Sequence, residues 1–234
     1  MQPYPVMEST TAVSEVQSSF VLKVYNWMTM GLALTALIAL GIEVALPGIR
    51  WIMLENPIIF YGLLILELAI VWGLSAAISK IPSLLAILIF LAYAALNGVT
   101  FSILFLVYTS GSIAYTFFIT AAMFGATSVF GFITKMDLSR IGGFLMMALF
   151  GLIIASVVNI FVASSPLDWI ISIAGVFIFV GLTAYDTQKI KNMSVGIDSS
   201  SEEGGKASIM GALTLYLDFI NLFLFLLRIL GRRR

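Results

Sequence analysis

The stretch IMGALTLYLDFINLFLFLLR, residues 209–228, is apolar enough to cross a bilayer, yet it carries a carboxylate, Asp218, near its middle. A helix of about 20 residues spans roughly the 30 Å of a hydrocarbon core. An ionised Asp at that depth costs about 2.5–3.5 kcal/mol, so the side chain needs a partner or a function. Helical spacing puts Gly211, Thr214 and Asn221 on the same narrow face as Asp218. We therefore expect this segment to be the central helix of a bundle, with its polar stripe facing a partner helix or a cavity.

The composition of the whole chain is that of an all-α, polytopic membrane protein. Of its 234 residues, 61% are hydrophobic and only 10% are charged, which is far outside the range of soluble globular proteins. The absence of Cys and His excludes disulfides, thiolate metal sites, and imidazole-based catalysis or pH sensing. The formal net charge of zero gives no support for nucleic-acid binding. We expect a membrane protein that is not an enzyme and holds no cofactor.

Seven apolar segments separated by turn signals predict a seven-helix transmembrane domain over residues 20–230. The predicted spans are 20–46, 57–79, 82–108, 113–134, 141–163, 167–189 and 209–228. Residues 1–19 are polar and lack the basic start of a signal peptide, so they are expected to form a disordered tail. Residues 231–234 form a basic C-terminal tail. The longest connection, Asn192–Lys206, is rich in Ser, Gly and acidic residues and is expected to be a solvated, mobile loop.

The distribution of Lys and Arg predicts a cytoplasmic N-terminus. In that orientation the cytoplasmic side receives Lys23, Lys80, Lys135, Arg140, Lys189, Lys191 and Lys206. The opposite loops contain only Arg50, but seven spans also place the arginines of residues 232–234 on that side. Either the tail is translocated despite its charge, or the last segment does not fully cross. We favour seven complete spans.

A second carboxylate, Asp186, lies near the end of the preceding apolar run, FIFVGLTAYDTQKIK. Two facing carboxylates in a low dielectric cannot easily both ionise, so the pair is expected to share one proton. Such a pair is a pH-sensing latch that needs no histidine. The simpler alternative is that each Asp is a neutral, hydrogen-bonded contact between helices. Lys189 either pairs with Asp186 or extends to the lipid headgroups, and we favour the second.

The two carboxylates lie in YDTQKI (Tyr185–Ile190) and LYLDFINLFLFLLR (Leu215–Arg228), and two further stretches are LNGVTFS (Leu96–Ser102) and FGFITKMDLSRIGGFL (Phe130–Leu145). These stretches resemble the Bax inhibitor (transmembrane Bax inhibitor motif) family, in particular its bacterial members. The resemblance implies a multi-pass protein of the inner membrane that leaks cations, with Ca²⁺ as the transported ion. In this family a basic residue late in the second span can pair with the acidic dyad. Only Lys80 is available there, so it joins Lys189 as a possible counter-charge of the gate.

Three further polar residues lie within apolar spans and leave two interpretations open. Glu67 has only apolar neighbours along its own helix, so its partner must come from another span. It is either a residue of the ion pathway or a buried hydrogen-bonding group. Asn97 and Asn221 line the same pathway or form hydrogen bonds between helices.

The leading prediction for function is a pH-sensitive calcium leak gated by Asp186 and Asp218. Carboxylate oxygens suit Ca²⁺, and two or three of them form a weak, transient site that favours conduction over storage. An intramembrane aspartyl protease also uses paired Asp residues, but its GxGD motif is missing before Asp218. The alternative is a non-conducting regulator that binds membrane proteins, such as a protease or a cell-death partner. A monomer satisfies either function.

Overall fold

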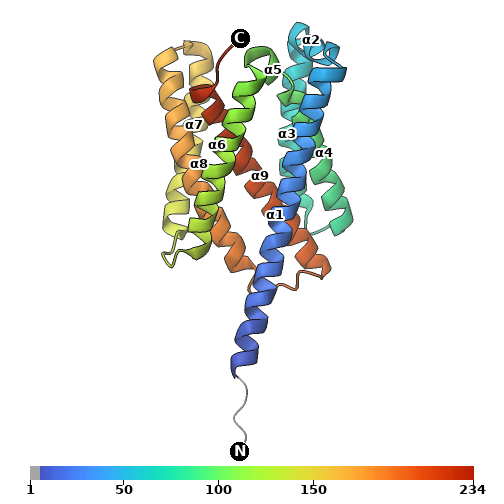
Figure 1. Ribbon diagram of the computed structural model, residues 1–234, viewed down its shortest axis with the longest axis vertical. Coiled ribbons are helices and arrows are strands. Elements are labelled where there is room, and N and C mark those ends of the chain that lie inside the picture. Colours follow the sequence, from blue (N-terminus) through green and yellow to red (C-terminus); the bar gives the residue numbers. More distant parts are fainter. Residues whose placement is uncertain (1–5) are drawn as a thin grey trace, which may run out of the picture. The chain divides into compact units, whose positions relative to one another are not determined.

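The computed structural model describes the backbone of residues 6–234 and the side chains of residues 18–234 (Figure 1). All regular elements in this part of the chain are helices, which confirms the predicted all-α fold. The helices are α1 (Val6–Ala45), α2 (Gly48–Glu55), α3 (Pro57–Ala77), α4 (Ser83–Phe101), α5 (Leu104–Val107), α6 (Ser110–Ile133), α7 (Ser139–Val162), α8 (Ser165–Met193) and α9 (Glu202–Leu230).

Seven helical segments are long and apolar enough to cross a membrane, as predicted. They are Ser18–Ala45, Pro57–Ala77, Ser83–Val107, Ser110–Ile133, Ser139–Val162, Ser165–Met193 and Glu202–Leu230. Only 6% of the apolar window of α7 is buried, whereas 67% of that of α9 is buried. α7 therefore turns its apolar side chains toward lipid, and α9 is an interior helix. That α9 is central to all seven spans stays a prediction.

The chain forms two compact units, and α8 and α9 contribute to both. The first unit comprises the chain up to Ile103 together with Ile190–Thr214. The second comprises Leu104–Lys189 together with Leu215–Arg234. Asp186 and Asp218 both belong to the second unit, whereas Glu67 belongs to the first.

In the first unit, α1 and α4 pack backbone against backbone. A Cβ at Gly98 would lie 2.8 Å from the Thr35 carbonyl oxygen and 2.7 Å from the Ile38 Cβ, so this approach requires glycine. The Thr35 hydroxyl donates a hydrogen bond to the Ala94 carbonyl oxygen at 2.8 Å. Small residues and one hydroxyl thus join these helices where lipid offers no hydrophobic driving force.

α1 begins well before the predicted span. Residues 6–17 are helical, whereas the sequence predicts a disordered tail over residues 1–19. No Gly or Pro occurs between Pro5 and Gly31, so nothing in this stretch breaks the helix. The apolar part begins at Ser18, close to the predicted boundary. Residues 1–5 of the predicted tail lie outside the described residues.

The third predicted span is interrupted near its end. α4 stops at Phe101, and a short turn at Ser102 and Ile103 separates it from α5. The Ser102 hydroxyl donates to the Val99 carbonyl oxygen at 2.6 Å, and the Ile103 N–H donates to the Thr100 carbonyl oxygen at 3.2 Å. These bonds to the third preceding residue tighten the last turn of α4, and the side-chain bond competes with the helical pattern.

The connection between α8 and α9 is shorter than predicted and is held by hydrogen bonds. It covers residues 194–201, whereas the sequence predicts a mobile loop over 192–206. Lys23 of α1 donates to the Ser199 carbonyl oxygen at 2.8 Å, and the hydroxyl groups of Ser19 and Ser199 are 3.2 Å apart. The loop therefore lies against the start of the first apolar span in the first unit.

Acidic residues of this connection act as hydrogen-bond acceptors. Glu202 accepts bonds from the hydroxyl and the backbone N–H of Ser83, the first residue of α4, and so caps that helix. The hydroxyl and the N–H of Ser200 both donate to Asp198, and these bonds lower the pKa of the Asp198 carboxyl group. The carboxylates thus order the segment as well as solubilising it.

The C-terminal tail, residues 231–234, pairs with the connection between α5 and α6. The Thr109 N–H donates to the Arg232 carbonyl oxygen at 3.1 Å, and the Arg234 N–H donates to the Val107 carbonyl oxygen at 3.0 Å. The last helix therefore ends beside the end of the third span, as expected for seven complete crossings. The arginines are thus part of an ordered segment of the second unit.

Candidate functional site

Asp186 and Asp218 lie together in the second unit. Asp186 on α8 is 7% exposed, Asp218 on α9 is 5% exposed, and their carboxyl groups lie close enough to interact with each other. Two ionised carboxylates offer only acceptors, so a hydrogen bond between them would need a proton on one of the two. The Oδ2 atom of Asp218 has no hydrogen-bond partner among the described residues. The pair is thus a buried group of two neighbouring carboxyl groups, and its sharing of one proton stays a prediction.

The surroundings of the pair on α9 are apolar. Leu215 and Leu222, one turn on either side of Asp218, are fully buried. The ring of Phe219 packs against Phe117 and Phe124 of α6, with centroids 5.3 and 5.5 Å apart. A charge in such a low-dielectric setting is costly unless it is paired or neutralised. The setting therefore penalises two ionised carboxylates that lie next to each other.

Two glycines allow neighbouring helices to approach α8 just before Asp186. A Cβ at Gly131 of α6 would lie 2.3 Å from the Ala184 carbonyl oxygen. A Cβ at Gly142 of α7 would lie 2.5 Å from the Tyr185 ring. Both distances are shorter than van der Waals contact, so larger residues require something to move. α6 and α7 thereby set the position of the turn that carries Asp186.

Gln188 joins the same part of α8 to the connection between α6 and α7, a role that the sequence does not reveal. Its amide oxygen accepts from the Leu138 N–H at 2.9 Å, and its amide nitrogen donates to the Met136 carbonyl oxygen at 2.7 Å. Both bonds go to the connection between α6 and α7. The only sequence feature that could have suggested this role of Gln188 is its polar side chain two residues after Asp186 in the YDTQKI stretch.

Replacing Gln188 by Met is expected to destabilise the protein by about 1–2 kcal/mol. The buried N–H of Leu138 would lose its acceptor, whereas the Met136 residue is exposed, so its carbonyl oxygen can bind water. The loss is measured as a lower Tm of the purified protein in detergent. A Tm equal to that of the wild type would mean that the amide does not hold α8 in place.

The two lysines predicted as counter-charges are both exposed. Lys189 is close enough to interact electrostatically with Asp186, but its side chain lies at the surface, as expected for a lysine that extends to the headgroups. Lys80 lies in the connection between α3 and α4 of the first unit. Its relation to the Asp pair stays a prediction.

Glu67 has a partner on another span, as the sequence requires. It is 8% exposed on α3, and its Oε1 atom lies 2.6 Å from the Thr100 hydroxyl of α4. The amide groups of Asn97 and Asn221 instead donate within their own helices, to Tyr93 at 3.1 Å and to the fourth residue before Asn221 at 2.8 Å. Their place on an ion pathway stays a prediction.

The carboxylates of the described residues are too dispersed for a resident metal site. No group of three or more His, Cys, Asp or Glu side chains is arranged to hold an ion in this part of the chain. Asp186 and Asp218 together supply four oxygens, fewer than the six to eight ligands of a typical Ca²⁺ site. The weak, transient calcium site predicted at the pair stays a prediction.

One buried ion pair in the first unit was missed by the sequence analysis. Arg50 of α2 is 6% exposed, and its guanidinium contacts the carboxylate of Glu43 near the end of α1. The spacing of seven residues across the Pro47-Gly48 break is the signal that could have suggested it. The pair fastens α2 to the end of α1, because separating it would leave a buried charge uncompensated.

The comparison with known proteins identifies the family. Residues 17–234 match the family described as inhibitor of apoptosis-promoting Bax1, Bax1-I. The chain belongs to the Bax inhibitor family. The inner membrane protein YbhL of Escherichia coli strain K12 is 47% identical to it over 235 residues, which cover 100% of both chains.

Other members of the Bax inhibitor family are almost as similar. An uncharacterized protein of Borreliella burgdorferi is 44% identical over 219 residues, 94% of each chain. A protein of Rickettsia prowazekii is 44% identical over 217 residues, 92% of this chain and 90% of its own. Together with the seven apolar helices, the match to YbhL identifies a multi-pass protein of the inner membrane, and this family of membrane proteins is not an enzyme family.

Proposed function

We propose that this member of the Bax inhibitor family is a pH-sensitive calcium leak gated by Asp186 and Asp218. The observation that supports it is the pair of buried carboxyl groups, which lie close to each other on consecutive spans. Ionisable residues inside a membrane are costly, so they are retained where they bind protons, ions or substrates.

The proton that joins the two side chains keeps the path closed. While it is present, the hydrogen bond holds α8 and α9 together at this level. When it leaves, two negative charges face each other among apolar side chains, and their repulsion separates the helices. Flux therefore rises as the pH rises, because deprotonation favours the open state.

The same two side chains attract the cation once they are ionised. Four carboxylate oxygens provide hard ligands for Ca²⁺ but leave its coordination incomplete, so water completes it and the ion leaves readily. Calcium is here the transported ion and not a cofactor.

Purified full-length protein in liposomes tests the proposal directly. Calcium influx is followed with an indicator inside the vesicles while the external pH is varied. The proposal requires influx above that of protein-free vesicles and an increase with pH. If no calcium influx is seen at any pH, the protein is not a calcium leak, whether or not Asp186 and Asp218 share a proton.

The second candidate is a non-conducting regulator, which the family description as an inhibitor of Bax1 favours. In that case the Asp pair holds α8 and α9 in the shape that a membrane partner recognises. The liposome measurement separates the two functions, because a regulator of this kind supports no calcium flux without its partner.

A further inference from the structure

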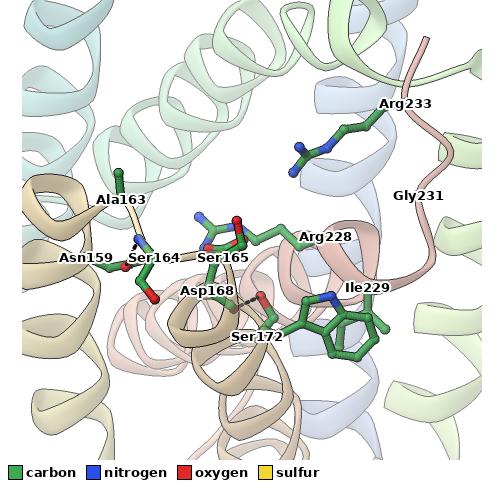
Figure 2. A pocket seen from close by; sticks show the side chains of 11 residues that line it. Asn159, Ala163, Ser164, Ser165, Asp168, Ser172, Arg228, Ile229, Gly231 and Arg233 are labelled. Atoms are coloured by element: carbon green, nitrogen blue, oxygen red, sulfur yellow. Dashed lines mark hydrogen bonds and ion pairs between the residues drawn. The ribbon is translucent and has the colours of Figure 1, made fainter.

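A polar cavity of about 490 Å³ lies in the second unit where α7 ends, α8 begins and α9 ends (Figure 2). Its size falls within the range of small-molecule sites in proteins. The charged side chains that line it are Asp168, Arg228 and Arg233, so its walls carry one more positive than negative charge. The Asp pair does not line this cavity, and the proposed gate makes no use of it.

Arg228 is directed toward the cavity while its hydrogen-bonding capacity is largely unused. In Figure 2 its guanidinium group reaches toward Asp168, and the closest N–O distance is 3.6 Å. That distance is an ion pair beyond hydrogen-bonding range. The guanidinium also lies over the ring of Phe225, 5.6 Å from its centroid. Arg228 is thus held in place and still able to donate to a ligand.

Arg233 reaches the same cavity because the backbone of the tail is fixed. It forms an antiparallel bridge with Tyr108, and the neighbouring Arg232 N–H donates to the Ser112 hydroxyl at 2.8 Å. A Cβ at Gly231 would lie 2.6 Å from the Tyr108 ring, so the tail passes close to that side chain. The basic tail therefore places one of its arginines, Arg233, in the lining of the same cavity as Arg228 (Figure 2).

We propose that this cavity binds a phosphate-bearing anion between Arg228 and Arg233. The guanidinium group is planar and donates two parallel hydrogen bonds to phosphate oxygens, which makes two arginines a fitting pair for such a group. Ser164, Ser165 and Ser172 add hydroxyl groups to the lining. The same walls would repel Ca²⁺, so the cavity is not a cation entrance.

The position of the cavity makes a lipid headgroup the nearest source of phosphate. Trp169 in its wall is 56% exposed, and the adjacent Ile170 and Phe161 are 64% and 83% exposed. Exposed tryptophan beside exposed apolar residues marks the boundary between hydrocarbon and headgroups. A site for headgroup phosphate also explains why arginines are retained at the end where the other loops have few basic residues.

Lipid binding to the purified full-length protein tests this proposal. Native mass spectrometry compares phosphatidylglycerol with phosphatidylcholine for the wild type, Arg233→Gln and Arg232→Gln. The two variants remove the same charge from neighbouring positions of the tail, but only Arg233 lines the cavity. We expect Arg233→Gln to weaken phosphatidylglycerol binding about fivefold, the effect of one basic residue near an anionic lipid, and Arg232→Gln to change it far less.

Competition with inorganic phosphate identifies the source of the anion. Phosphatidylglycerol that stays bound in excess phosphate indicates a lipid site, whereas its release indicates a site for free phosphate. Equal losses in Arg233→Gln and Arg232→Gln, or equal wild-type binding of the two lipids, would overturn the proposal. An unchanged Tm in both variants shows that the comparison is made between folded proteins.

Discussion

Replacing either carboxyl group of the Asp pair by an amide is expected to abolish the pH response of calcium flux. In Asp186→Asn and Asp218→Asn an amide hydrogen bonds to the remaining side chain without a titrating proton, so no repulsion between two charges develops. With one proton in control, the wild-type open fraction changes by up to about tenfold per pH unit. The variants should show a flat profile at low flux, measured in liposomes across a pH series.

The double variant and Glu67→Gln provide the controls for this measurement. Asp186→Asn with Asp218→Asn should be no worse than either single change, because the two residues act as a unit. Glu67→Gln lies in the first unit and should lower flux while leaving the midpoint of the pH profile in place. If both single Asp variants kept the wild-type profile, the pair would be a structural contact and not a gate.

Gly131→Ala is expected to destabilise the protein by about 3 kcal/mol, the upper end of the range for overpacking. The added Cβ would meet a backbone carbonyl oxygen, that of Ala184, at 2.3 Å, and backbone cannot rotate away as a side chain can. α8 must therefore shift at the turn before Asp186. A lower Tm in detergent would report the loss of stability, and an altered pH profile of calcium flux would report the shift of the α8 turn before Asp186.

Gly125→Ala is the matched control on the same helix. A Cβ at Gly125 meets nothing within 4 Å, and alanine has the higher helix propensity, so its Tm should equal or exceed that of the wild type. The pair Gly142→Ala and Gly143→Ala repeats the comparison on α7, because only Gly142 lies against Tyr185. Equal Tm values for Gly131→Ala and Gly125→Ala would contradict the close approach of α6 to α8.

The class of the protein and its candidate residues could be predicted from the amino-acid sequence alone. Seven apolar segments exceed what a soluble protein can bury, and each is long enough to satisfy its backbone within one helix. Asp186 and Asp218 stood out because a carboxylate in such a segment is costly, so its presence is informative even in a single sequence. The family followed from the stretches around them.

The boundaries of helices and the state of the connections could not be predicted as well. Residues 6–17 continue α1, and the α8–α9 connection is held by Lys23 and Ser83. Local composition reports that a segment is polar, but not whether distant donors will reach it. The hydrogen bonds at the α8–α9 connection join residues more than 100 positions apart in the chain.

The positioning of the Asp pair and the place of the basic tail could not be predicted, because both depend on contacts between distant segments. Gly131, Gly142 and Gln188 bring α6 and α7 against the turn of α8 that carries Asp186. The tail becomes a wall of a cavity because it pairs with the segment around Tyr108. These contacts depend on close packing between segments far apart in the chain, and helical periodicity carries no information about which helix lies opposite.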